Sequence, residues 1–367
     1  MNRNRMASKF NRRLALSTLA ASSLMTAGCP LSIPASLPAD APSDDTSPDS
    51  IASLVAETLQ YEKQSRGLST MVNGAWQIFH GVLAYGSEFE IDTPLGREPA
   101  LRYFTGGGTC EGFRPSAGNL IGEKKRQGLR VEIEPSTKVG QGHRDQWLAV
   151  VAQAGLPLDA TWVVDGKTFL VSDWMRQAEY DVPLNYEAEF SWTLIPLSFY
   201  RPTNYRWTAR DGDTYSTELL LESEVLRDLS QSVCGGTHRL IGIAFAVRNR
   251  VSEGSPMSGI WSDAQTHLQE SIDLAKANQN PDGSYSTSYM HRTGWCSDMG
   301  EMLGTTGHVL EFLSVAADEE TLRSQWVQRS VRRLCEVLRQ CRGIDLECGV
   351  LYHALHGLVE YNRRVTV

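Results

Sequence analysis

The amino-acid sequence lacks the long apolar segments of membrane-spanning domains and the basic stripes of nucleic-acid-binding proteins. After residue 50, no stretch is long and apolar enough to cross a membrane. Basic residues form no stripe and are outnumbered: 35 Lys and Arg stand against 43 Asp and Glu, a formal net charge of −8 at pH 7. An acidic chain repels nucleic acid and anionic lipid, so we expect neither as a partner.

The sequence contains one candidate linker and lacks a second. Only Pro30–Ser50 is rich in proline, serine and aspartate, and such a segment cannot bury a core. We therefore interpret residues 29–50 as a disordered tether and residues 51–367 as one compact domain.

The first residues resemble an export signal. Residues 1–13 carry five basic and no acidic groups, and a short apolar run follows from Leu14 to Ala27. The pair Arg12-Arg13 resembles a twin-arginine signal, although basic Sec signals contain such pairs as well, so both export routes stay open. We predict that residues 1–28 are a signal peptide and that the protein is exported to the cell envelope.

Cys29 is the candidate lipidation site. The segment Thr26-Ala27-Gly28-Cys29 resembles a lipobox, with Thr26 where lipoproteins usually have Leu. Cleavage before Cys29 would change the formal charge to −13 and leave six further cysteines, for which disulfides are permitted but no pairing is fixed. We expect a lipoprotein, attached to the membrane through its lipid anchor, on the periplasmic or outer surface.

Two kinds of helix alternate along residues 51–367. Asp263–Gln279 and Glu320–Cys341 show one apolar stripe among polar residues and are typical of half-buried helices. The segments that follow His238 and His308 are apolar nearly all round and are typical of helices buried on every side. Thr161–Leu170 also fits a small hairpin. We predict an all-α protein without a substantial sheet.

A motif resembles the squalene and hopene cyclases. Gln279–Tyr285, "QNPDGSY", is similar to their Q-x-x-x-G-x-W motif with Tyr285 in place of Trp, and "DGKTF" at Asp165 and "DGDTY" at Asp211 are weaker echoes. Short segments that contain glycine and lead to a histidine also recur along the chain. The resemblance implies an α/α toroid, the terpenoid cyclase-like fold shared with protein prenyltransferases, in which outer helices enclose inner ones.

The chemistry of these families does not follow from the resemblance. The cyclases protonate an alkene with an Asp-x-Asp-Asp motif, which this chain lacks. Protein prenyltransferases bind zinc through Asp-x-Cys and a later His; here the order is reversed, Cys296-Ser297-Asp298, with His353 beyond. Cys296, Asp298 and His353 therefore remain only weak candidates for a zinc site.

The whole chain is similar to a group of exported bacterial proteins of unknown function. They share "CGGTHRL", "TGH" and "LYHAL" segments and are sometimes described as GTPase-activating proteins for ADP-ribosylation factors. True activators of that kind carry a Cys-x-x-Cys zinc module, which is absent from this sequence. The resemblance therefore implies no such activity.

The histidines are the main candidate site residues. His143, His238 and His308 each follow a short segment that contains glycine, so we expect them in the first turn of inner helices. His353 lies in a looser version of this pattern. At a helix N-terminus, the dipole favours a neutral imidazole, which can accept a proton or bind a metal. If the helices run parallel, the four side chains meet at one mouth of the cavity. For any single histidine, a simple capping role is the favoured interpretation, whereas for the set the two interpretations are about equally good.

Two further groups are candidates. Cys234 with His238 offers soft ligands for a transition metal such as zinc, provided that Gly235-Gly236 leave Cys234 on the same helical face. Glu187 and Glu189 beside Trp192 resemble the carboxylate pair of a carbohydrate cleft, one acid having a raised pKa. An amphipathic helix with solvated glutamates is the simpler interpretation.

Two hypotheses about function remain. In the first, the toroid cavity binds or acts on a small molecule or a glycan, with the histidines at its rim. In the second, the protein is a non-catalytic envelope scaffold whose cavity is filled by side chains. The sequence leaves open whether the protein is an enzyme, as well as the ligand, the metal content and the oligomeric state.

Overall fold

Helices dominate the protein, and the computed structural model describes residues 48–366. About 54% of these residues are helical and 13% are in strands. These residues form one compact unit. The expected signal peptide, Cys29 and the tether up to residue 47 lie outside the described residues. The prediction of a mainly helical protein is confirmed, because the strand content stays below the roughly one-fifth of ordinary mixed domains.

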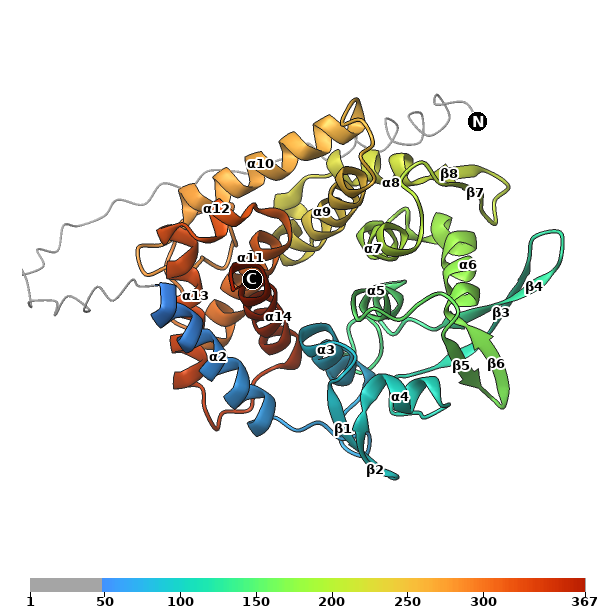
Figure 1. Ribbon diagram of the computed structural model, residues 1–367, viewed down its shortest axis with the longest axis horizontal. Coiled ribbons are helices and arrows are strands. Elements are labelled where there is room, and N and C mark those ends of the chain that lie inside the picture. The colour runs from blue at the N-terminus through green and yellow to red at the C-terminus, as the bar shows by residue number, and fades with distance from the viewer. Residues whose placement is uncertain (1–47, 367) are drawn as a thin grey trace, which may run out of the picture. The chain divides into compact units, whose positions relative to one another are not determined.

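Six helices contact one another in a closed order. Each packs against the next along the chain, and the last packs against the first (Figure 1). Most of their residues are buried, as expected for segments that are apolar nearly all round. These inner helices are α3 (Ala75–Tyr85), α5 (Gln146–Gln153), α7 (Ser191–Tyr200), α9 (Thr237–Ser252), α11 (Met299–Ala316) and α14 (Cys348–Val365).

The other helices precede or connect the inner ones and, where they are long, keep one exposed face. They are α2 (Pro48–Ser65), α4 (Ala100–Thr105), α6 (Val171–Asp181), α8 (Thr217–Val225), α10 (Ile260–Asn278), α12 (Glu319–Leu322) and α13 (Gln325–Gln340), with short 3-10 turns at η1 (Val182–Asn185), η2 (Leu229–Gln231) and η3 (Val233–Gly236). Between residues 48 and 366, no helix combines the length and the apolar character needed to span a membrane.

The helix expected over Glu320–Cys341 is divided in two. Asp318 caps α12, whose last residue is Leu322, and α13 begins only at Gln325. By contrast, the half-buried helix expected over Asp263–Gln279 is present as α10 and starts three residues earlier. Local apolar spacing therefore predicted where the helices lie, but not where a cap interrupts them.

Four two-stranded antiparallel hairpins lie beside the helices. Three of them lead directly into a helix: the second strand ends one residue before α4, α6 or α8 begins. The strand pairs are β1 (Glu90–Thr93) with β2 (Gly96–Pro99), β3 (Pro115–Ile121) with β4 (Arg126–Val131), β5 (Thr161–Val164) with β6 (Lys167–Leu170), and β7 (Arg206–Thr208) with β8 (Thr214–Ser216).

Both weak echoes of the cyclase motif are hairpin turns. Asp165 and Gly166 have φ angles of +48° and +72° and join β5 to β6, as in the turns that match strand twist. "DGDTY" likewise joins β7 to β8. The hairpin interpretation of Thr161–Leu170 is confirmed. Unlike the cyclase motif, "DGKTF" and "DGDTY" lie in hairpins that precede α6 and α8, not in loops that precede one of the six inner helices.

The stronger motif, Gln279–Tyr285, follows α10 and lies against α13. Gln279 Nε2 donates to Trp326 O over 2.7 Å and to Ser330 Oγ over 2.8 Å. Ser330 Oγ in turn donates to Gly283 O over 2.7 Å, and Tyr285 is fully buried. The motif thus fixes the end of one connecting helix to the next before the chain enters α11.

Candidate functional site

Five histidines gather where the inner helices meet, and we call them the histidine cluster: His80, His143, His238, His308 and His353. The His238 ring centroid lies 5.6 Å from those of His143, His308 and His353. His308 and His353 are 4.2 Å apart, and His80 is 5.2 Å from His353. The structure therefore brings together all four histidines that the sequence singled out and adds His80.

The expected position of these histidines in the first turn of a helix holds only for His238, the second residue of α9. His143 precedes Asp145, the N-cap of α5. His308 is the tenth residue of α11, and His353 is the sixth of α14. The prediction of a first-turn position is therefore wrong for two of the three histidines it covered, His143 and His308, and the histidines meet mainly along the sides of the helices.

Glycine has a different role in α11 from the one the pattern suggested. A Cβ atom added at Gly307 would lie 2.7 Å from Ala354 Cβ, and one at Gly357 would lie 2.9 Å from Glu311 N. These glycines allow α11 and α14 to approach closely, so they lie inside helices that continue through them. This close approach brings His308 next to His353.

Four rings of the cluster are held through Nδ1. Two donate to backbone carbonyls, His80 to Trp76 O over 2.5 Å and His308 to Gly304 O over 2.7 Å. Two face carboxylates, His143 towards Glu189 Oε1 and His353 towards Glu311 Oε2, each over 2.8 Å. With the proton on Nδ1, the Nε2 lone pair is available, which is the orientation typical of metal-binding histidines.

Burial keeps much of the cluster neutral. It lowers the pKa of His80 to about 3, and it also lowers those of His308 and His353 despite the nearby carboxylate of Glu311. Neutral imidazoles at neutral pH can bind a cation, whereas protonated ones would repel it.

His238 has no hydrogen-bond partner at either ring nitrogen, although its side chain is only 6% exposed. Its Nδ1 lies 3.9 Å from Glu189 Oε1, which is beyond hydrogen-bonding distance. A buried polar group without a partner costs about 1 to 3 kcal/mol, so such groups are rare. The unpartnered His238 is the feature of the cluster that most needs a ligand to explain it.

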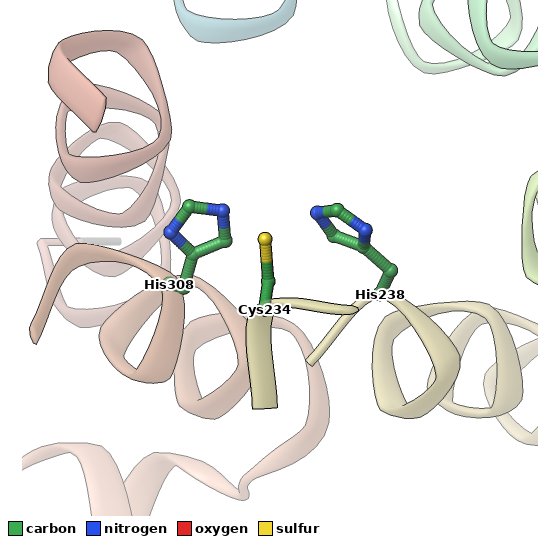
Figure 2. Close-up of side chains that lie close together, drawn as sticks. All are labelled: Cys234, His238 and His308. Atoms are coloured by element: carbon green, nitrogen blue, oxygen red, sulfur yellow. The ribbon is translucent and has the colours of Figure 1, made fainter. Parts of the chain in front are cut away.

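Cys234 lies beside this histidine. It begins a left-handed turn in which Cys234, Gly235 and Gly236 have φ angles of +52°, +62° and +78°. The turn brings the thiol of Cys234 and the imidazoles of His238 and His308 together, with ligand atoms within 4.8 Å of one another. Figure 2 shows the thiol between the two rings, and one nitrogen of each ring turned towards it. Cys234 thus joins the site without the regular helical spacing that the sequence seemed to require.

A second group of ligand atoms within 4.8 Å consists of His143, Glu189 and the same His238. Burial alone would raise the pKa of Glu189, but the hydrogen bond from His143 and the charges of His238 and His143 lower it to about 2. Trp192 Nε1 also donates to Glu189 Oε1 over 2.7 Å.

The expected carboxylate pair is not formed. Glu189 is buried whereas Glu187 is exposed, and the pKa of Glu189 is lowered rather than raised. The simpler expectation of solvated glutamates on an amphipathic helix is also wrong for Glu189, because both residues precede α7, a helix buried over most of its length. Spacing in the sequence could not reveal that His143 binds this one carboxylate.

Cys296 and Asp298 do not join His353. Cys296 Sγ donates to Asp298 O over 3.5 Å, and Asp298 caps α11 by accepting from Glu301 N. Neither belongs to the two groups of possible metal ligands in the described part of the chain. All six cysteines between residues 48 and 366 are free thiols, so the permitted disulfides are not formed there.

Sequence reasoning missed Glu311, His356 and His80. Glu311 accepts from His353 and, through its other oxygen, from His356 Nδ1 over 2.6 Å. These hydrogen bonds and the charges of both histidines hold the pKa of Glu311 well below its usual range, despite burial that would raise it. The available signal was a titratable residue among apolar neighbours, Glu311 in "VLEFLSV" and His80 in "IFHGVLA".

A cleft of about 380 Å³ lies beside β4 and the turn between β7 and β8. None of the cluster histidines contributes to its walls, which are formed by Asn119, Arg130, Val131, Glu132, Ile133, Arg144, Leu184 and Arg210.

In comparisons with known proteins, no family, no curated protein and no solved structure matches this chain. What is established is therefore its mainly helical class and the geometry of the histidine cluster.

Proposed function

We propose that this protein binds a transition metal ion at the centre of an α/α toroid and holds a small-molecule or glycan ligand at an open coordination position. The observation that carries the proposal is the buried, unpartnered His238 next to Cys234 and His308. Thiolate and imidazole together favour zinc, a borderline soft ion.

The three ligand atoms fit a metal ion after a small contraction. Zn–N distances of about 2.0 Å and Zn–S distances of about 2.3 Å place tetrahedral ligands roughly 3.5 Å apart. The atoms of Cys234, His238 and His308 already lie within 4.8 Å of one another. Gly304 O orients the His308 ring by accepting from its Nδ1, as partners outside the ligand shell of a metal do.

Three protein ligands leave one position for water or a ligand, which is typical of catalytic rather than structural zinc sites. A metal ion there would polarise a bound oxygen atom and lower the pKa of bound water. Cys234 is half-buried and the side chain of His143 is 22% exposed, so this side of the cluster is the route by which a small molecule would enter.

The toroid is part of the proposal. The closed order of contacts among α3, α5, α7, α9, α11 and α14 supports it, and so does the place of the Gln279–Tyr285 motif between a connecting helix and an inner one. Export and attachment through Cys29 complete the proposal, and they rest on the sequence alone.

The test is metal binding by the purified full chain, stripped with a chelator and titrated with zinc against a competing chromophoric chelator. We expect Cys234→Ser and His238→Ala each to weaken binding at least tenfold. Cys110→Ser and His267→Ala are matched controls, because both residues lie outside the two groups of possible ligands. Wild-type protein that binds no zinc, or variants that bind as well as the controls, would contradict the proposal.

The scaffold hypothesis makes the opposite prediction. If His238 only fills space at the centre, His238→Ala lowers the free energy of unfolding by more than a capping bond of about 1 kcal/mol and leaves metal binding unchanged. If it binds a ligand, the cost in the metal-free protein is small, because neither ring nitrogen has a partner to lose. Denaturant unfolding of metal-free wild type and variant separates the two.

A further inference from the structure

We propose that His238 bridges two metal positions, the second one formed by its Nδ1 together with His143 and Glu189. This inference rests on the proposed metal position at Cys234, His238 and His308 and goes beyond it. The two groups of possible ligands share this one residue, and it is the one residue that both groups need.

The bridge follows from the two nitrogens of one ring. Figure 2 shows one nitrogen of His238 turned towards Cys234 and His308 and the other turned away from them. Nδ1 lies 3.9 Å from Glu189 Oε1, on the side of the second group. Neither nitrogen has a hydrogen-bond partner. A single metal ion would use one of them and leave the other buried without a partner, whereas two ions use both.

The second position has ligands of suitable chemistry. Glu189 Oε1 lies 2.8 Å from His143 Nδ1, so a carboxylate and an imidazole already face each other beside His238. Two nitrogens and one oxygen suit zinc or copper. His143, whose side chain is 22% exposed, is the most exposed member of this group.

Metal binding at both positions displaces protons from the ligands. On binding two divalent ions, His238 loses its ring proton and Cys234 loses its thiol proton, both to solvent. His143 keeps one proton. This proton moves from Nδ1 to Nε2, because Nδ1 gives up its hydrogen bond to Glu189 and binds the ion. Glu189 is already ionised and still accepts from Trp192. Counted from neutral rings and a neutral thiol, filling both positions releases two protons per chain, and the metal affinity falls as pH falls.

The alternative is that Glu189 only orients His143. It predicts one metal ion per chain, and removal of Glu189 would then change its affinity but not the number bound. The number of ions, rather than the affinity, therefore decides between the two arrangements.

The experiment measures metal content by elemental analysis of the full chain, reconstituted with zinc and freed of excess ion. We expect two ions in the wild type, one in Glu189→Gln and in His143→Ala, one in Cys234→Ser, and loss of both in His238→Ala. Glu187→Gln is the matched control: it is an exposed carboxylate two residues from Glu189 and outside both groups, and we expect it to keep two ions.

A spectroscopic measurement on the wild type supports the same decision even if a variant fails to fold. Two Co(II) ions, which thiols do not reduce, are magnetically coupled when an imidazolate joins them, so we expect a weakened electron paramagnetic resonance signal that regains full intensity on acidification. One ion per wild-type chain with an uncoupled signal overturns the bridge and leaves the proposed function intact. No bound ion in the reconstituted wild type overturns both.

Discussion

His353 Nδ1 lies 2.8 Å from Glu311 Oε2, although 42 residues separate the two in sequence. Both side chains are buried, and the other oxygen of Glu311 accepts from His356. A single carboxylate thus orients two rings of α14 from the facing helix α11. It directs His353 towards His308 while keeping its own charge compensated.

Replacing this carboxylate should affect both stability and binding. We expect Glu311→Gln to lower the free energy of unfolding by about 2 kcal/mol, because buried hydrogen bonds to charged groups contribute about 1.5 to 3 kcal/mol. We also expect zinc affinity to fall by roughly tenfold, because the ring of His353 packs 4.2 Å from that of the proposed ligand His308 and helps to hold it in place. Chemical denaturation and zinc titration measure the two effects. Glu301→Gln, on the exposed side of α11, should change neither by a comparable amount.

Acid should destabilise the metal-free protein below about pH 6.5. The folded pKa of His80 is about 3, lowered first by burial and then by His353, against a usual value of 6.5. Between these values the unfolded chain binds more protons, so stability is fully present above pH 6.5 and is lost as pH falls. His80 alone contributes a slope of about 1.4 kcal/mol per pH unit in this window.

His80→Gln tests this contribution. Glutamine does not titrate but can still donate to Trp76 O, so the variant should lose stability less steeply than the wild type between pH 6.5 and 5. Unfolding free energies measured at several pH values give the two slopes. Equal slopes would show that His80 is not the titrating group.

The close approach of α11 and α14 should not tolerate a methyl group. A Cβ at Gly307 would lie 2.7 Å from Ala354 Cβ and 2.8 Å from its Cα, and neither helix backbone can move easily. We expect Gly307→Ala to cost about 1 to 3 kcal/mol. Gly67→Ala is the control, since no atom lies within 4 Å of the added methyl group and its effect should stay within about 0.5 kcal/mol. Thermal and denaturant unfolding measure both effects. A cost for Gly307→Ala as small as that for Gly67→Ala would contradict the close approach of the two helices.

Membrane attachment depends on Cys29 if the lipoprotein prediction is correct. We expect Cys29→Ser to release the exported protein from the membrane fraction, because acyl chains on this residue would supply the anchor. Fractionation and immunoblotting measure the release. Retention of a correctly exported variant in the membrane would contradict the prediction, which no part of the described structure tests.

The sequence by itself determined the helical class and the segments that carry the site. Apolar residues with helical spacing predict buried and half-buried helices, because their spacing determines whether one face or all faces of a helix are apolar. It also marked His143, His238, His308 and His353, since a histidine beside an apolar segment stands out in composition. The positions of α10 and of the hairpin at Thr161–Leu170 follow from the same local signals.

Only the tertiary structure decided how these segments meet. Whether Gly307 ends a helix or permits close packing depends on Ala354, 47 residues away, so the local pattern predicted a helix start where α11 in fact continues. The same holds for Glu311 with His353 and for Glu189 with His143. A carboxylate is solvated or buried, and its pKa raised or lowered, according to the partner that folding brings to it, and no spacing along the chain encodes that partner.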